Sequence, residues 1–489
     1  MKKSYPILAV LLLLCTCFSS CKDDDDTLPS EERITTEEIY YANRFASDIL
    51  SDVYLWNTEI SEDISLLDPN TNTDPISTVA DIRYSENGKE VDKWTVLTDD
   101  YETFINSMSG VETTYGYGLA MGRFTNTGTY FFVVTYVYAD SPAADAGIKR
   151  GDMIISLNGE DITESNYLNV LYSSSVTLGM GTYTNEGIAQ GGNIRLTATQ
   201  MYENPILAYK IFENGGKTVG YLAYASFDLR SVSQLINICK EFKAAGVTEL
   251  ILDLRYNGGG YVITEEALAS MFAPAEEVAA KSLYQTEVWN ASYTEYFRVN
   301  GMDRNTYFST DFTVQDLAGN DLDVSTADAN IGLNKIYALI SSGTASASES
   351  LLIGLMPFMD IELLGSNSHG KYCTGAVLQP SDVYKSAPDA IHNWGIYVMI
   401  NRFADKNGNN PCMPNGLAPD IEVDDNLFDG CQLGDEQETM LNAALTQAGM
   451  TNATGTRTMV KSPYDTKLMQ TSPLFGKRID NSIIEKIRK

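Results

Sequence analysis

The chain has 489 residues, of which 34 are Lys or Arg and 65 are Asp or Glu, so its formal charge is −31. This acidity argues against nucleic acid as a partner, because affinity for phosphate backbones depends mostly on Lys and Arg. With 44% hydrophobic and 20% charged residues, the composition is that of a globular protein with several domains rather than of a disordered chain.

The N-terminus has the pattern of a lipoprotein signal. Two lysines precede an apolar run at 7–14 that is too short to span a bilayer, and small residues lead to Cys21. Phe18-Ser19-Ser20-Cys21 resembles a bacterial lipobox. We therefore expect residues 1–20 to be a lipoprotein signal peptide, with lipid on Cys21 as the chain's sole membrane attachment. An ordinary secretory signal with an incidental cysteine is the alternative.

Residues 21–33 are expected to form an acidic tether, because four aspartates, Asp23 to Asp26, follow the cysteine almost directly. Cys-Lys-Asp-Asp also resembles the surface-export signal of Bacteroidetes lipoproteins. We expect the protein to be an outer-membrane lipoprotein. The sequence does not decide whether it faces the cell surface or the periplasm.

Cysteine and histidine usage predicts neither a metal site nor a cofactor. Four cysteines remain beyond the signal and Cys21, and their spacing is not that of a zinc site. Cys412 and Cys431 flank a loop-like segment and could form a disulfide in an oxidising compartment.

Residues 34–110 are predicted to form a helical module, because apolar residues recur at helical spacing near its start. Residues 111–205 switch to short apolar strands around a small helix that Ser141 and Pro142 open. This order resembles a PDZ domain of the bacterial protease type. The resemblance implies that Gly116, Tyr117, Gly118 and Leu119 bind a peptide's terminal carboxylate while the peptide adds as a strand.

Strands and helices alternate through residues 206–430, which predicts an α/β core with a parallel sheet. Residues 285–330 are harder to place and are expected to be an inserted loop or hairpin. A β-hairpin turn is predicted after residues 397–402, and residues 431–489 are expected to be a helical tail.

Residues 341–349, Ser-Ser-Gly-Thr-Ala-Ser-Ala-Ser-Glu, lie between a predicted strand and a predicted helix. Ser346 and Glu349 have the spacing of a capping box, which by itself explains both residues. A serine at such a turn also lies beside free N–H groups and the positive end of the helix dipole, where an oxyanion is best stabilised. Ser346 is therefore a candidate nucleophile, with the helix cap as the alternative.

A Gly-rich turn, 258–260, follows an earlier predicted strand. Three consecutive glycines let a substrate backbone approach closely and can expose an N–H as an oxyanion donor, although a flexible turn is the alternative. The base is harder to find, because only His369 of the two histidines lies in a suitable region. Lys371 can accept the seryl proton when burial keeps its amine neutral, which gives a Ser-Lys dyad. A solvated amine is the alternative.

These motifs, in this order, resemble the C-terminal processing, or tail-specific, protease family over about residues 34–429. Residues 253–260 are similar to the family's oxyanion strand and turn, and 344–349 to its nucleophile motif. The resemblance implies a crotonase-like core. It also implies Ser346 as nucleophile, Lys371 as base, and the N–H groups of Gly259 and Ala347 as oxyanion donors.

One position departs from the family. Many relatives carry a glutamine four residues after the lysine, where this chain has Gly375. Gln379, Ser366 or a main-chain carbonyl are the candidates to hold the Lys371 amine instead. His369 is expected to pack nearby rather than to assist.

The leading hypothesis is an exported, lipid-anchored serine endopeptidase that captures the C-termini of protein or peptide substrates on its PDZ domain and cleaves them with a Ser-Lys dyad. A catalytically impaired peptide-binding lipoprotein is the alternative, because the expected glutamine is missing. A third hypothesis is a periplasmic regulator that cleaves a transmembrane signalling protein with the same chemistry.

Overall fold

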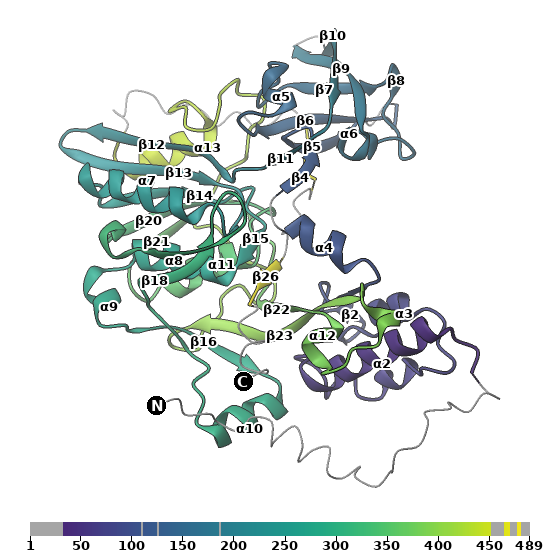
Figure 1. Cartoon of the computed structure of the whole chain (residues 1–489). Coiled ribbons are helices and arrows are strands. Elements are labelled where there is room, and N and C mark those ends of the chain that lie inside the picture. Colours follow the sequence, from purple (N-terminus) through teal and green to yellow (C-terminus); the bar gives the residue numbers. More distant parts are fainter. Residues whose placement is uncertain are drawn as a thin grey trace.

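The computed structural model describes residues 33–108, 111–124, 127–184, 187–450, 464–469 and 477–480. The expected signal peptide, Cys21 and nearly all of the acidic tether lie outside the described residues. Figure 1 shows N-terminal helices, a strand-rich domain and a larger α/β core, in the order of the chain. No helix in the described ranges has the length and apolar character needed to cross a bilayer.

The N-terminal module is built on helix α2 (Glu37–Asp52), which begins where the Thr36 hydroxyl accepts the Ile39 N–H at 3.2 Å. Strand β3 joins the module to the core, since Val96 pairs with Tyr397. The remaining elements are η2 (Asp63–Leu66), α3 (Pro75–Ile82), β1 (Ser85–Glu86), β2 (Lys89–Glu90), β3 (Val96–Thr98) and α4 (Tyr101–Met108).

The second domain is a sheet with strand order β10-β9-β7-β6-β5, and it has its own buried core. Its short helix α5 begins as expected, because the Ser141 hydroxyl accepts the Ala144 N–H at 3.1 Å and Pro142 follows. The elements are β4 (Val111–Thr114), β5 (Tyr117–Arg123), β6 (Tyr130–Val137), α5 (Pro142–Asp145), β7 (Met153–Leu157), β8 (Glu160–Asp161), α6 (Asn169–Tyr172), β9 (Ser175–Thr184), β10 (Gly187–Thr197) and β11 (Thr199–Tyr202).

The core contains a sheet of order β12-β13-β14-β20-β21-β24, parallel from β13 onward, as the alternation of strands and helices predicts. In Figure 1 helices lie along both faces of this sheet. Its elements are β12 (Ile206–Asn214), β13 (Lys217–Tyr224), α7 (Val232–Ala244), β14 (Glu249–Asp253), α8 (Val262–Phe272), β20 (Lys335–Ile340), α11 (Ala347–Leu355), β21 (Asp360–Gly365), β24 (Ile421–Glu422) and α13 (Thr439–Gln447).

A second core sheet has the order β15-β26-β22-β23-β16-β17. It comprises β15 (Gly259–Tyr261), β16 (Leu283–Trp289), β17 (Thr306–Tyr307), β22 (Cys373–Leu378), β23 (Gly395–Asp405) and β26 (Lys477–Ile479), and the short helices α9 (Ala275–Ala279), α12 (Pro380–Val383) and η4 (Asp389–Ile391) lie along the same part of the chain. Strand β26, yellow in Figure 1, lies between β15 and β22.

Three expectations need correction. Residues 285–330 hold regular structure beyond a single hairpin: α10 (Ala291–Asn300), the β18 (Asp311–Gln315) and β19 (Asp321–Ser325) pair, and η3 (Ala327–Ala329). After β23, Asp405 closes a turn with Asn409, but the next described strand is the parallel β24, so no hairpin forms. In the described part of the tail, α13 is the only helix, and residues 466–468 and 477–479 pair with sheet edges as β25 and β26.

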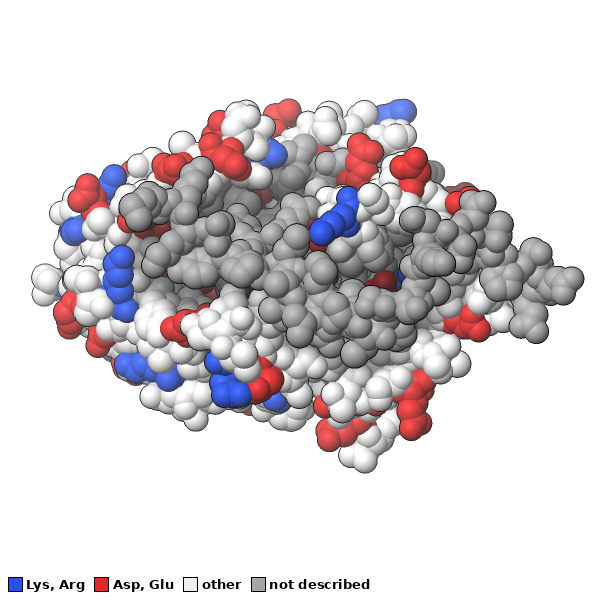
Figure 2. All heavy atoms as spheres, turned by 60° about the horizontal axis from the view of Figure 1, so that its bottom comes forward, with Lys and Arg blue, Asp and Glu red and all other residues white. Residues whose placement is uncertain are grey.

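Figure 2 shows one face of the molecule with acidic and basic side chains interspersed over its described residues.

Candidate active site

Ser346 lies in the turn between β20 and α11, and its side chain is fully buried. Its φ of +63° is in the left-handed region, which costs a non-glycine residue on the order of 1–3 kcal/mol. The Ser346 N–H donates to Glu349 Oε2 at 2.8 Å, whereas the Ser346 hydroxyl has no hydrogen-bond partner among the described residues. The expected capping box of Ser346 and Glu349 is present, and the glutamate supplies its hydrogen bond.

The Gly-rich segment holds this turn in place. Thr344 Oγ1 donates to the Leu254 carbonyl at 2.8 Å. The Ala345 N–H and the Ser348 hydroxyl both donate to the Asn257 carbonyl, each at 3.0 Å. The two turns that the sequence singled out separately thus form one hydrogen-bonded unit.

Gly259 and Gly260 adopt φ values of +109° and +142°, which favour glycine. A side-chain carbon at Gly260 would lie 2.3 Å from the Phe227 carbonyl oxygen, and one at Gly259 would lie 2.9 Å from Ser346 Cβ. Glycine is required at both positions, because the backbone there passes close to Phe227, which follows β13, and to Ser346.

The two expected oxyanion donors, the N–H groups of Ala347 and Gly259, differ in their hydrogen bonding. Ala347 is the first residue of α11, so its N–H belongs to the helix N-terminus, which has no carbonyl of its own helix to bind. The Gly259 N–H instead donates to Asn257 Oδ1 at 2.9 Å. An oxyanion at Gly259 would have to replace the Asn257 side chain.

Lys371 is fully buried just before β22. Its Nζ donates to Tyr397 Oη at 2.8 Å and lies 5.4 Å from the centre of the Trp94 ring. Because the Ser346 hydroxyl has no partner in the described part of the chain, a Ser346–Lys371 side-chain hydrogen bond is absent there.

Glu349 nevertheless joins the backbones of both residues. Its Oε2 accepts the Ser346 N–H at 2.8 Å and the Lys371 N–H at 3.0 Å, and its Oε1 accepts from Gly370 at 2.7 Å and from the Ser368 hydroxyl. Burial raises the pKa of this carboxyl group, although these donors oppose the shift. Glu349 is therefore a positioning residue for which the sequence supplied only the helix-cap interpretation.

Tyr397 is the partner of Lys371 that sequence reasoning missed. A side-chain carbon at Gly375 would lie 2.4 Å from the Tyr397 ring, so the ring occupies the space beside the glycine. Gly375 is the position at which many relatives carry glutamine. Gln379 lies between β22 and α12, where it forms a capping box with Asp382 and its backbone N–H donates to the Asp382 carboxylate. A glycine inside a buried strand was the available signal, since such a residue often admits a large neighbour.

His369 lies next to the site as a packing element. Its N–H donates to the Thr344 carbonyl at 2.8 Å, which attaches the lysine segment to the serine turn. Burial lowers the pKa of the His369 imidazole, with nearby Lys93 and Lys371 adding to the effect, so the neutral ring is favoured.

The predicted carboxylate-binding residues lie at the start of β5. Tyr117 and Gly118 pair with β6, and the Gly116 N–H donates to Thr114 Oγ1 at 3.0 Å. The Leu119 carbonyl accepts the Met469 N–H from the C-terminal segment at 2.9 Å. These residues thus form a strand whose outer edge already holds another strand, rather than an open loop.

A buried ionic cluster connects the second domain to the Gly-rich segment. Arg255 is fully buried and donates to Asp253 at 2.8 Å and to Glu438 at 2.7 Å. Arg150, from the second domain, donates to Asp425 at 2.6 Å, and Arg255 also donates to Asp425 at 2.9 Å. The two arginines hold the pKa of Asp425 well below its usual range, although burial acts the other way.

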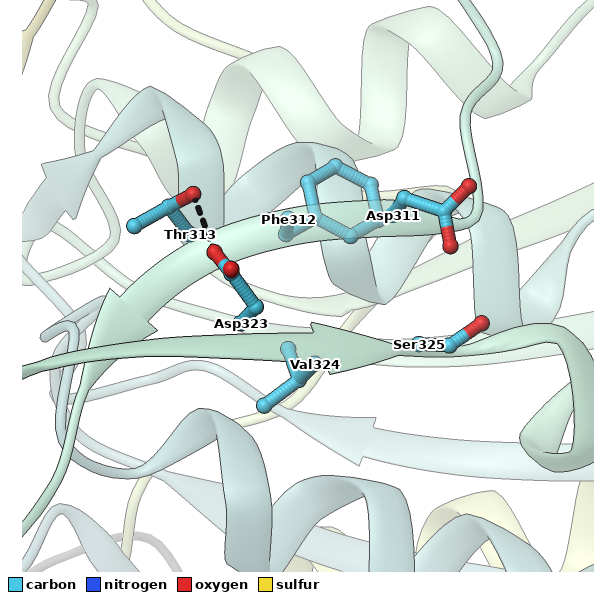
Figure 3. A pocket seen from close by; sticks show the side chains of 6 residues that line it. All are labelled: Asp311, Phe312, Thr313, Asp323, Val324 and Ser325. Carbon is cyan, nitrogen blue, oxygen red and sulfur yellow. Dashed lines mark hydrogen bonds between the residues drawn. The ribbon is translucent and has the colours of Figure 1, made fainter.

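In the described part of the chain, the other candidate sites do not bring together catalytic or metal-binding groups. The hollow in Figure 3 belongs to the β18–β19 pair, where Thr313 donates to Asp323 at 2.7 Å, and its lining comes from neither catalytic turn. Within the described ranges, His, Cys, Asp and Glu side chains form no group that could hold a metal ion. The described residues likewise contain no Cys412–Cys431 disulfide, and burial beside Glu349 raises the pKa of the Cys412 thiol.

Two regions of the chain match known families. Residues 218–423, which hold both catalytic turns and Lys371, match Peptidase family S41, and residues 133–178 match the PDZ domain. The α/β core is an S41 peptidase domain. The second domain is a PDZ domain, so the expected family and the α/β fold class with a PDZ domain are confirmed.

The chain resembles C-terminal processing proteases at low identity. It is 23% identical over 246 residues to the carboxy-terminal processing protease CtpB of Bacillus subtilis, covering 49% of the chain and 44% of the relative. It is 22% identical over 311 residues to the carboxyl-terminal-processing protease of Synechocystis, covering 63% and 62%. The chain thus spans less than two thirds of the length of these relatives.

The fold also resembles a solved structure. A crystal structure from Bacteroides fragilis assigned to the S41 proteases has a TM-score of 0.61 and 21% identity, covering 83% of this chain and 98% of that chain. At this identity the likeness shows a shared fold.

Proposed function

We propose that this chain is an exported serine endopeptidase that cleaves proteins with a Ser346–Lys371 dyad. The observation that supports it most is the Glu349 carboxylate, one oxygen of which accepts the N–H of both Ser346 and Lys371. A single buried anion thereby fixes the nucleophile and the base relative to each other, which is what proximity catalysis needs.

The proposed reaction begins when Ser346 Oγ attacks the substrate carbonyl carbon and passes its proton to the neutral Lys371 amine. The Ala347 N–H stabilises the oxyanion, together with the Gly259 N–H once Asn257 Oδ1 is displaced. The protonated lysine then gives the proton to the leaving amine. Water, deprotonated by Lys371, hydrolyses the acyl-enzyme and frees Ser346.

Substrate capture and location complete the proposal. The PDZ edge strand β5 would hold a substrate C-terminus near residues 116–119, and the N-terminal signal would place the enzyme on the outer membrane through lipid at Cys21. The proposed partners are protein substrates and, through the lipid anchor, the membrane.

The test is an assay on the protein lacking residues 1–21, with an unfolded protein such as reduced casein as substrate. We expect internal fragments by mass spectrometry, none with Ser346→Ala, and wild-type activity with Ser342→Ala, whose side chain is exposed in the same turn. Equal fragmentation by Ser346→Ala would refute the proposed nucleophile.

The alternative is a catalytically impaired peptide-binding protein. The absent Ser346–Lys371 bond and the occupied Gly259 N–H favour it. A protein that binds peptides but never cleaves them, in any buffer between pH 7 and 10, would support this alternative.

Tyr397 should orient Lys371, as its hydroxyl accepts the amine hydrogen bond at 2.8 Å. We expect Tyr397→Phe to lower kcat by roughly 10- to 100-fold, with KM little changed, because one hydrogen bond to a charged group is worth about 1.5–3 kcal/mol. Activity should rise toward alkaline pH as the Lys371 amine loses its proton, and because an acceptor favours the protonated amine, this rise should move to lower pH in the variant. Rate measurements against pH check both effects.

A rescue separates orientation from packing. Tyr397→Ala opens the space beside Gly375, and adding Gly375→Gln should restore part of the lost kcat by placing an amide near Lys371. If the double variant is no more active than Tyr397→Ala, although equally stable, the amine is not oriented from this space.

A further inference from the structure

The C-terminal segment lies on the two surfaces that the proposed function assigns to substrate. Strand β25 (Thr466–Leu468) pairs antiparallel with the PDZ strand β5, with Lys467 opposite Met121. Strand β26 pairs in parallel with β15 of the Gly-rich turn, with Lys477 opposite Gly259. Both pairings use the edge on which a peptide would add as a strand.

The segment is seated by side chains as well as by its backbone. Leu468 packs with Ala120, Phe131 and Val133 of the PDZ sheet. Ile479 is almost fully buried, and the Asp480 N–H donates to the Gly375 carbonyl at 3.1 Å. The segment is thus an integral part of both surfaces.

At the Gly-rich turn the segment reaches the nucleophile. The Lys477 carbonyl oxygen lies 2.7 Å, and Ser346 Cβ 2.9 Å, from the point that a side-chain carbon on Gly259 would occupy. The Lys477 amine lies 4.9 Å from the centre of the Phe104 ring, and burial lowers its pKa to about 8 while Glu112 opposes the shift. A substrate backbone could not take this place beside Gly259 and Ser346 while Lys477 is there.

The order of the two strands distinguishes an inhibitor from a substrate. A C-terminus held on β5 would place residues that precede it in the active site. In this segment the residues on β5 come first, and those beside Ser346 follow. The Gly259 N–H also donates to Asn257 Oδ1. The segment is therefore not presented for cleavage.

We propose that residues 464–469 and 477–480 act as a built-in competitor, which must leave β5 and β15 before a substrate can bind. The proposal rests on the proposed function for the identity of the substrate path. Tethering gives the segment a local concentration in roughly the millimolar range, so that even weak pairing competes with free peptides.

A reversible lock tests this inference. Met121→Cys with Lys467→Cys places two thiols on directly opposite residues of an antiparallel pair, which is within disulfide reach. The background lacks residues 1–21 and carries Cys431→Ser, so that the other cysteines are buried. The same protein, oxidised and then reduced, serves as its own control.

The readouts are binding of a fluorescent peptide with the sequence of residues 464–480, followed by anisotropy, and cleavage of reduced casein. We expect the oxidised form to bind the peptide at least 10-fold more weakly than the reduced form and to cleave at least 10-fold more slowly. Met469→Pro, which removes the N–H donor to Leu119, should bind the peptide about 3- to 10-fold more tightly than Met469→Ala.

Each outcome of this experiment either supports or contradicts the competitor proposal. Failure of the disulfide to form, or equal binding and cleavage in both redox states, would overturn the competitor proposal. Redox-dependent peptide binding without casein cleavage in either state would support the competitor and refute the proposed protease function. Cleavage that is unaffected by a verified disulfide would leave the protease function standing alone.

Discussion

Ser346→Ala and Lys371→Met are each expected to lower kcat/KM by roughly 1,000-fold or more, and the double variant is expected to lose no more than either single variant. The reason is that the two side chains act in one proton transfer, so that removing either ends it. Activity on a casein-derived peptide, measured with all three variants, checks the prediction.

Methionine is a suitable replacement for Lys371 because the amine is fully buried beside aromatic rings. A neutral side chain of similar length avoids the cost of burying a charge, so stability should be kept or increased. Losses that multiply in the double variant would mean that the two residues act separately. Unchanged activity in Lys371→Met would show that another group is the base.

Arg255→Met is expected to lower the free energy of unfolding by about 3–5 kcal/mol, the typical cost of removing one partner from a buried ion pair. The change leaves the carboxylates of Asp253 and Glu438 buried with fewer donors. Arg298→Met is the matched control, because its ion pair with Glu295 is largely exposed and screened by solvent, so its loss should change stability far less. Urea unfolding of both variants measures the difference.

The same cluster predicts a dependence on pH. The pKa of Asp425 is lower in the folded protein than in the unfolded chain, so the unfolded state binds the proton first as the pH falls. Its contribution is present above the ordinary pKa of 3.8 and is lost progressively as the pH falls from there toward the lowered value. Arg255→Met should make stability fall less steeply with acid over that range. An equally steep fall would show that Asp425 keeps its low pKa without Arg255.

The sequence was informative where function depends on local pattern. Strand-helix alternation predicted the parallel core, and the Ser-Pro start with a following Gly predicted the small helix α5. The order of Gly-rich turn, serine turn and lysine predicted the family. Each of these signals spans only a few residues, and most of them follow from the local conformational preferences of the backbone.

Contacts between distant segments decided the rest. Tyr397 is 26 residues from Lys371 and meets it only because β22 and β23 pair across Gly375. Residues 466–468 and 477–479 carry no strand pattern of their own, and they are extended because the open edges of β5 and β15 offer them unpaired backbone groups. Composition, family and the candidate roles of Ser346 and Lys371 thus followed from the sequence by itself. The partner of the lysine and the occupant of the peptide path required the tertiary structure, because side-chain space and free sheet edges exist only once the chain has folded.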